Sequence, residues 1–243
     1  MLGRMETTLH RQLKERFMEE GSEIEVRVER YRIDVVTGNR LIEIQRSGLS
    51  SIRDKIRNLL DKNYRVEVVK PLVVRKQLVK LSRKNGKVVD RRWSPKRGTI
   101  MDVFDELLYF TRVFPHPNLR LICPMIEMQE IRYPGHGKRR RRRKGDFVVK
   151  DRLLTEIQET HVFDTAQDLH RLLPKKLPSP FDTKELAAGL KMQRGDAQKI
   201  AYVLRHTGSV ELVGKRGNAN LFELAKAAKK RRKKKFRAVK RAA

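Results

Sequence analysis

Two acids and an amide, Asp34, Glu43 and Gln45, stand among apolar residues in the segment 32–47, RIDVVTGNRLIEIQRS. If residues 37–40 form the turn of a hairpin, Asp34 lies directly opposite Glu43. Side chains alternate along a strand, so the two acids and Gln45 share one face. Two like charges about 5 Å apart destabilise a strand pair. A divalent cation such as Mg²⁺ would offset this repulsion, because it binds carboxylates and keeps waters for a substrate phosphate.

The rest of this hairpin leaves two interpretations of the acids open. The same alternation places four apolar side chains together on a buried face: Ile33, Val35, Ile42 and Ile44. On the first interpretation the acids pair with Arg32, Arg46 or Arg53 on a solvated face. On the second they hold a metal ion, which is favoured by the apolar character of the strands and by a chain that is basic enough to bind a phosphodiester substrate.

The charge of the chain predicts a polyanionic partner. The sequence has 58 Lys and Arg against 29 Asp and Glu, a formal net charge of +29 and a pI near 10.7. Nucleic acid is therefore the expected partner. We find no run of about 18 apolar residues and no signal-peptide core, so we expect no membrane association and a cytoplasmic protein, nucleoid-associated if prokaryotic. Cys123 is the one cysteine, which excludes an internal disulfide and a zinc site built on cysteines.

Hydrophobic periodicity predicts an α/β (α+β) fold with a central mixed sheet flanked by helices. The first part of the chain reads as a helix, a strand meander and a second helix, at residues 7–20, 24–45 and 50–60, followed in the stretch 64–74 by a strand that ends near Pro71. The next part reads as a hairpin insertion, a helix, a strand and an exposed basic loop, at residues 76–97, 99–114, 119–133 and 134–145.

The C-terminal part predicts a small separate domain. Residues 173–180 are proline-rich and read as a linker that follows a domain of residues 1–172. In residues 181–225, Asp182 and Glu185 have the spacing of a helix capping box. A second helix and a hairpin follow, at residues 193–208 and 210–224, which together predict a winged helix. Residues 226–243 are too basic to fold alone and predict a disordered tail.

The opening segment resembles the PD-(D/E)xK nuclease superfamily. Asp34 is followed after eight residues by Glu43-Ile44-Gln45, with Gln45 where that superfamily usually has lysine. The stretch 42–64 is also similar to the nuclease core of competence-associated CoiA-like proteins, which show the same Glu-x-Gln variant. The resemblance covers about residues 5–75. It implies a restriction-endonuclease-like sandwich that hydrolyses phosphodiester bonds of DNA with Mg²⁺ or Mn²⁺.

The resemblance also implies roles for individual residues. Asp34, Glu43 and the carbonyl of Ile44 would hold the metal ion, which supplies the nucleophile by lowering the pKa of a bound water. Gln45 can orient that water, but its neutral amide cannot offset charge as lysine does. Lys55 or Arg53 on the next helix would then supply the positive charge. On the first helix, Glu6 and His10 are the groups expected to face the metal.

The expected nucleic-acid contacts lie in three places. DNA is favoured over RNA, and each cation that meets a phosphate would add salt-dependent affinity. The candidates on the helix after the acids, in the basic loop and in the winged helix are Arg53, Arg57, Lys138, Arg139, Arg140, Arg141, Arg142, Arg143, Lys144, Arg194, Gln198, Lys199, Arg205, Lys215 and Arg216. Two other functions stay open: a DNA-binding protein with an inactive nuclease fold, and a basic architectural or ribosome-associated protein.

Overall fold

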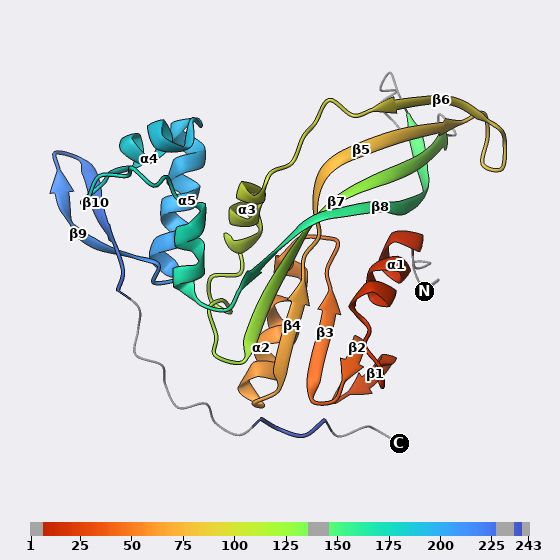
Figure 1. The fold of residues 1–243 in the computed structure, drawn as a ribbon, viewed down its shortest axis with the longest axis horizontal. Coiled ribbons are helices and arrows are strands. Elements are labelled where there is room, and N and C mark those ends of the chain that lie inside the picture. The colour runs from red at the N-terminus through yellow and green to blue at the C-terminus, as the bar shows by residue number, and fades with distance from the viewer. Residues whose placement is uncertain (1–6, 136–145, 227–235, 240–243) are drawn as a thin grey trace.

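The computed structural model describes residues 7–135, 146–226 and 236–239. The fold is α+β, with a large mixed sheet flanked by helices and a small separate C-terminal sheet, as the sequence predicts (Figure 1). The large sheet has eight strands in the order β1-β2-β3-β4-β7-β5-β6, and β8 pairs with β7.

The first part of the sheet is the predicted meander followed by a parallel strand. Its elements, in chain order, are α1 (Thr8–Phe17), β1 (Glu23–Val28), β2 (Tyr31–Thr37), β3 (Arg40–Ile44), the 3₁₀ turn η1 (Leu49–Ile52), α2 (Arg53–Asp61) and β4 (Arg65–Val69). β1, β2 and β3 are antiparallel neighbours, whereas β4 runs parallel to β3. The carboxyl ends of β3 and β4 therefore meet at one end of the sheet.

Helices cover both faces of the β2–β3 hairpin. One core cluster joins α1 to one face: Leu9, Leu13, Val35, Ile42 and Ile44. The other cluster joins α2 to the opposite face: Ile33, Val36, Leu41, Ile56 and Leu59. The prediction that Ile33 shares a face with Val35 is therefore wrong. Glu25 on the neighbouring strand has a φ of +56°, a left-handed backbone conformation that interrupts the regular pairing of β1 with β2 at this point.

Four long strands carry the sheet away from the helices as an arm. They are β5 (Leu72–Leu81), β6 (Val88–Trp93), β7 (Leu119–Pro134) and β8 (Phe147–Phe163). β7 pairs first with β4 and then with β5, and β8 runs along its other edge. We define the arm as residues 72–97, 125–134 and 147–159, which extend beyond α1 in Figure 1. The predicted hairpin at residues 76–97 is confirmed by the pairing of β5 with β6.

Of two predicted elements before β7, one is confirmed and one differs in the structure. The strand predicted to end near Pro71 is β4, and the next strand, β5, begins after this proline, which cannot donate to a ladder. The helix predicted at residues 99–114 is confined to η2 (Ile100–Asp102) and α3 (Val103–Leu107). The following apolar side chains Phe110 and Phe114 are fully buried in turns, so tertiary packing and the proline after Phe114 override the helical periodicity.

The C-terminal part has the predicted order of two helices and a hairpin. It contains η3 (Ala166–Leu172), α4 (Thr183–Leu190), α5 (Arg194–His206), β9 (Val210–Arg216) and β10 (Ala219–Leu224). The capping box is confirmed, because Asp182 accepts the N–H groups of Lys184 and Glu185 and the Glu185 carboxylate accepts the N–H of Asp182. The apolar residues of these helices belong to the same core cluster as α2 and α3.

The linker and the tail are more closely attached than the sequence suggests. Leu173 and Leu177 of the predicted linker 173–180 pack against the core. In the predicted disordered tail, residues 236–239 lie against the main sheet region. Arg237 donates its N–H to the Asn63 carbonyl over 3.0 Å and lies 3.3 Å from Glu29. A few apolar and hydrogen-bonding residues beyond the basic run thus suffice to bind this segment.

Candidate active site at the end of β3

The backbone of the first hairpin has the predicted register and then changes its hydrogen bonding beside the acids. The ladder pairs Val36 with Leu41 and Val35 with Ile42, and it stops one pair short of the predicted opposition of Asp34 and Glu43. The next N–H, that of Ile44, donates to Asp34 Oδ2 over 2.8 Å. The Asp34 side chain thus holds the end of β3 where a strand backbone would otherwise do so.

Two basic side chains of α1 face Asp34. His10 Nε2 lies 3.1 Å from Asp34 Oδ1. Lys14 Nζ lies 3.6 Å from the same oxygen and 2.8 Å from Glu25 Oε1. His10 and Lys14 are four residues apart, which puts them on one face of α1. The sequence singled out His10 but missed Lys14, because a lysine on an amphipathic helix normally projects into water.

Lys55 reaches Glu43 from α2. Its Nζ donates to Glu43 Oε2 and to the Arg32 carbonyl oxygen, each over 2.6 Å. Of the two basic residues that the resemblance offers in place of the usual lysine, Lys55 thus contacts an acid of the site. Arg53 instead lies 3.5 Å from Asp54 on the exposed side of α2.

The acids are therefore paired with basic side chains, but not with those that the surface-pairing interpretation names. Arg32 pairs with Glu25, and Arg46 donates to the Thr7 hydroxyl. Glu43 and Gln45 are both buried. The structure thus gives the acids partners on α1 and α2 that are buried (Lys14) or partly buried (His10 and Lys55), whereas the surface-pairing interpretation expects flexible partners on a solvated face.

The two carboxyl groups have pKa values shifted in opposite directions. Burial raises the pKa of Glu43, and the negative charge of Asp34 adds to this against the opposing effect of Lys55. Burial also favours the neutral form of Asp34, but hydrogen bonds from His10 and the Ile44 N–H, with the charges of His10 and Lys14, lower its pKa. Neighbouring acids whose surroundings separate their pKa values are typical of sites that move protons.

Gln45 is held by the loop that follows β3. Its side-chain Nε2 lies 2.6 Å from Ser47 Oγ, 3.0 Å from the Gly48 carbonyl oxygen and within hydrogen-bonding reach of Ser51 Oγ. The backbone N–H of Gln45 continues the pairing with β4 by donating to the Val69 carbonyl. The amide nitrogen is thus used to fix the loop.

A buried ion pair that the sequence did not reveal supports the same loop. Lys70, at the carboxyl end of β4, donates to the Ser47 carbonyl oxygen over 2.8 Å and lies 3.0 Å from Glu106 Oε1. Glu106 in turn accepts the Leu49 N–H over 3.0 Å. Only the β3–β4 pairing brings Lys70 beside residues 47–49, so no local pattern could have indicated it.

The donor set fits a hard divalent cation in kind. Asp34, Glu43 and the Ile44 carbonyl offer only oxygen, as Mg²⁺ and Mn²⁺ prefer. In the part of the chain that the structure describes, no group of three or more His, Cys, Asp or Glu side chains is placed to hold a metal ion. A cation here would therefore use the two carboxylates and the carbonyl and complete its shell with water and substrate oxygens.

Replacing Asp34 by asparagine tests the electrostatics of this site without assuming a reaction. Because the pKa of Asp34 is lowered, its ionised form stabilises the fold above its unfolded pKa, and this stabilisation is lost as pH falls through the folded pKa. We expect Asp34→Asn to lower the free energy of unfolding by about 1.5 kcal/mol at pH 7 and by much less at pH 3. Urea denaturation at both pH values measures it.

Asp54→Asn is the matched control for this experiment. Asp54 also faces basic side chains, Arg53 and Arg57, but its side chain is 63% exposed. We expect a change within about 0.5 kcal/mol at either pH. An Asp34→Asn effect of equal size at pH 7 and pH 3 would contradict the lowered pKa.

Some of the other predicted site residues have a position in the structure, and some lie outside the described residues. Those outside are Glu6 and the basic run 138–144. Arg57 pairs with Asp54. On the C-terminal part, two of the predicted contacts form ion pairs: Lys199 with Asp105 and Asp196, and Arg216 with Glu185 and Asp182. The remaining four are exposed: Arg194, Gln198, Arg205 and Lys215.

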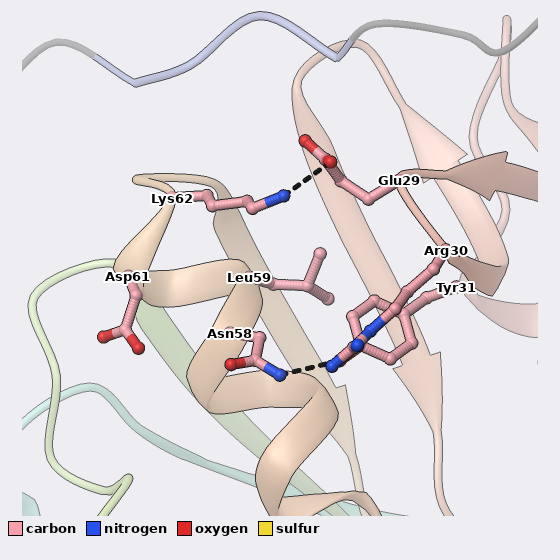
Figure 2. A pocket seen from close by; sticks show the side chains of 7 residues that line it. All are labelled: Glu29, Arg30, Tyr31, Asn58, Leu59, Asp61 and Lys62. Carbon is pink, nitrogen blue, oxygen red and sulfur yellow. Dashed lines mark hydrogen bonds and ion pairs between the residues drawn. The ribbon is translucent and has the colours of Figure 1, made fainter.

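A separate hollow of about 370 Å³ lies between α2 and the β1–β2 turn (Figure 2). Its lining residues are Glu29, Arg30, Tyr31, Asn58, Leu59, Asp61 and Lys62. Figure 2 shows Lys62 reaching toward Glu29, with 2.6 Å between Nζ and Oε2. None of these residues belongs to the acidic site, and several of their polar groups bind one another, so we assign the hollow no role.

Comparisons with known proteins place the acids within a matched region. Residues 7–164 match the family model described as Domain of unknown function (DUF8091). A protein of Treponema pallidum (strain Nichols), described as "Uncharacterized protein", is 31% identical over 221 residues, which cover 89% of this chain and 84% of that protein. No solved structure matches. The family match contains the acids and the arm and ends before α4.

Among the described residues, no helix is long and apolar enough to cross a bilayer.

Proposed function

This chain belongs to the family described as Domain of unknown function (DUF8091), and we propose that it is a metal-dependent nuclease that hydrolyses phosphodiester bonds of DNA. The observation that carries the proposal is the coupled acid pair at the end of β3. Burial, together with the charge of Asp34, raises the pKa of Glu43, and Lys55 contacts Glu43 over 2.6 Å.

The position of this pair supports a site rather than a structural ion pair. Glu43 lies at the carboxyl end of β3, beside the carboxyl end of the parallel strand β4, and Asp34 of β2 binds the Ile44 N–H at this end; ligands of α/β sheets gather at this end of parallel strands. The basic side chains that face the acids come from both flanking helices, α1 and α2. The two carboxylates are held by separate elements. A cation bound to a substrate can therefore enter between them with little rearrangement of the backbone.

We assign the chain's own residues the following roles. Asp34, Glu43 and the Ile44 carbonyl would hold Mg²⁺ or Mn²⁺, which when bound lowers the pKa of a water and polarises a phosphate. Lys55 would offset negative charge that develops on the phosphate. His10 would keep the Asp34 carboxylate oriented. Gln45 would act on the loop 47–51 and not on the attacking water, because its amide nitrogen is bound there.

A second candidate function is DNA binding without cleavage. The observation that favours it is the same use of Gln45, since no lysine stands at that position and the amide nitrogen is bound in the loop. In this case Lys55 and Glu43 would form a permanent ion pair that holds α2 on the sheet. The positive charge of the chain would still serve the binding of DNA.

Metal binding and cleavage by the wild-type chain separate these functions. We expect titration calorimetry with Mn²⁺ to give heat for the wild type and none for Asp34→Ala. We expect the wild type to cut plasmid or single-stranded DNA in Mg²⁺ or Mn²⁺ and to be inactive in EDTA. DNA that is bound but never cut would support the second candidate, and the absence of both Mn²⁺ binding and cleavage would reject the nuclease.

A further inference from the structure

The arm begins at the acidic site. β3 ends at Ile44 beside Val69 of β4, and after Lys70 and Pro71 the chain enters β5, the first strand of the arm. In Figure 1 the arm extends from this end of the sheet, past α1, to the turn between β5 and β6. A polymer lying along the arm would therefore run toward the carboxyl ends of β3 and β4.

The outer part of the arm carries positive charge that the described residues do not compensate. This outer part, residues 80–92, contains a single acid, Asp90, and these exposed cations: Lys80, Arg83, Lys84, Lys87, Arg91 and Arg92. Among described residues, only Arg92 has an acidic partner within 4.0 Å, namely Asp90. Like charges this close repel one another, and a bound polyanion removes that repulsion.

The inner part of the arm differs, because two buried acids, Glu127 and Glu130, pair with its cations on β5, β7 and β8. Glu130 is 3% exposed in its side chain and contacts Lys76, Arg132 and Arg152. Arg75 lies 3.6 Å from Glu127 and stacks with its Cζ atom 4.1 Å from the Trp93 ring centroid. Among the described residues, the cations of residues 80–92 are thus unpaired except for Arg92, whereas buried acids bind Arg75, Lys76 and Arg152 nearer the sheet.

We propose that the outer arm, through Lys84, Lys87 and Arg91, binds the phosphate backbone of duplex DNA and leads the duplex to the acids at the end of β3. The choice of DNA as the polyanion rests on the proposed function. Residues 80–92 contain no aromatic side chain on which an unpaired base could stack, and the exposed aromatic side chains next to them, Trp93 and Phe147, already stack with Arg75 and Arg132. Lysine and arginine contacts to phosphates carry no base information, so the arm binds duplexes of any sequence.

Two charge-matched triple variants test this binding site. The arm variant is Lys84→Gln/Lys87→Gln/Arg91→Gln. The control variant is Lys175→Gln/Lys176→Gln/Lys184→Gln, which removes the same charge from exposed positions of the C-terminal part that are not among the predicted DNA contacts. Fluorescence anisotropy with a labelled DNA duplex in EDTA, over a range of salt concentrations, measures binding while cleavage is prevented.

We expect the arm variant to bind the duplex roughly tenfold or more weakly and to lower the salt slope by about 3, because each substituted cation leaves one phosphate without its neutralising charge. We expect the control variant to change affinity and slope by much less. Equal losses of affinity in both variants would show that only the net charge matters and would overturn the proposal. An arm variant that binds the duplex as tightly as the wild type would also overturn it. Tighter wild-type binding to RNA or to anionic vesicles than to duplex DNA would also overturn it.

The same measurements keep this proposal separate from the nuclease. A wild type that binds through the arm but does not cut DNA in Mg²⁺ or Mn²⁺ supports the arm and rejects the nuclease. A wild type whose cleavage and binding survive the arm substitutions supports the nuclease and rejects the arm.

Discussion

Glu43→Gln should lower DNA cleavage by roughly 10²- to 10⁴-fold, because it removes the charge of a carboxylate that would hold the cation on which activation of the attacking water depends. Glutamine has the size of glutamate and can still accept a hydrogen bond from Lys55, so the buried surroundings of the side chain are kept. The substitution removes only the charge that would bind the cation. Initial rates of plasmid cleavage in Mg²⁺ and in Mn²⁺, with duplex binding measured in EDTA, check this expectation.

The stability of the same variant distinguishes a reacting group from a structural one. Because the pKa of Glu43 is raised, the folded state binds this proton more tightly than the unfolded state does. The free energy of unfolding therefore falls as pH rises from the unfolded pKa toward the folded pKa. Glutamine does not titrate and avoids this loss. We therefore expect Glu43→Gln to unfold within about 1 kcal/mol of the wild type at pH 7 while cleavage is abolished or nearly so.

Glu67→Gln is the matched control on the neighbouring strand. Glu67 is 4% exposed on β4 and lies 3.6 Å from Arg40. It is a buried acid of the same sheet, but it does not contact Asp34, Lys55 or the loop after β3. We expect its cleavage rate to match the wild type. Cleavage that survives Glu43→Gln, or that Glu67→Gln abolishes equally, would place the reaction elsewhere in the chain.

Local features of this protein could be predicted because the residues that define them are close in sequence. The β2–β3 register followed from alternation and a short turn, and the ladder Val35–Ile42 has it. The capping box of α4 needed only Asp182 and Glu185. Lys55 was one of two candidates for a cation beside Glu43, since the helix carrying it directly follows β3.

Contacts between distant segments could not be predicted in this way. The start of α1 is held by Asp151, whose Oδ1 accepts the Thr8 N–H over 3.0 Å from a strand that the sequence did not predict. Lys14 and Lys70 have the polarity of surface residues, yet their side chains are 6% and 5% exposed. Each is buried by an acid from another element, so its position depends on the assembled sheet and not on its neighbours in sequence.

These buried lysines bear on how the site keeps its shape. Lys14 holds Asp34 and Glu25 together beneath α1, while Lys70 and Glu106 hold the loop that also binds Gln45. The acids thus lie between two regions that are fixed by separate ion pairs. Lys55 is the basic residue that contacts Glu43 itself, so its removal should affect both the fold and the chemistry.

Lys55→Met should lower the free energy of unfolding by about 3 kcal/mol at pH 7, because it leaves the Glu43 carboxylate buried without its cation. The Glu43 side chain is 11% exposed, so water can solvate only a small part of the charge. Without Lys55 the pKa of Glu43 rises further, and protonation removes the unpaired charge. The loss of stability should therefore be smaller at pH 5 than at pH 7, which urea denaturation at the two pH values measures.

Two further variants attribute this loss of stability to the pair. Arg53→Met removes a cation two residues earlier, whose side chain is 40% exposed, and we expect a change within about 0.5 kcal/mol. In the double variant Lys55→Met/Glu43→Gln no buried charge is left, so most of the stability should return. If the double variant is as unstable as Lys55→Met, the methylene packing of Lys55 and not its charge supports α2. If the double variant recovers stability but not cleavage, the result fits two roles for Lys55. It would hold Glu43 in the free protein and contact the phosphate in the complex.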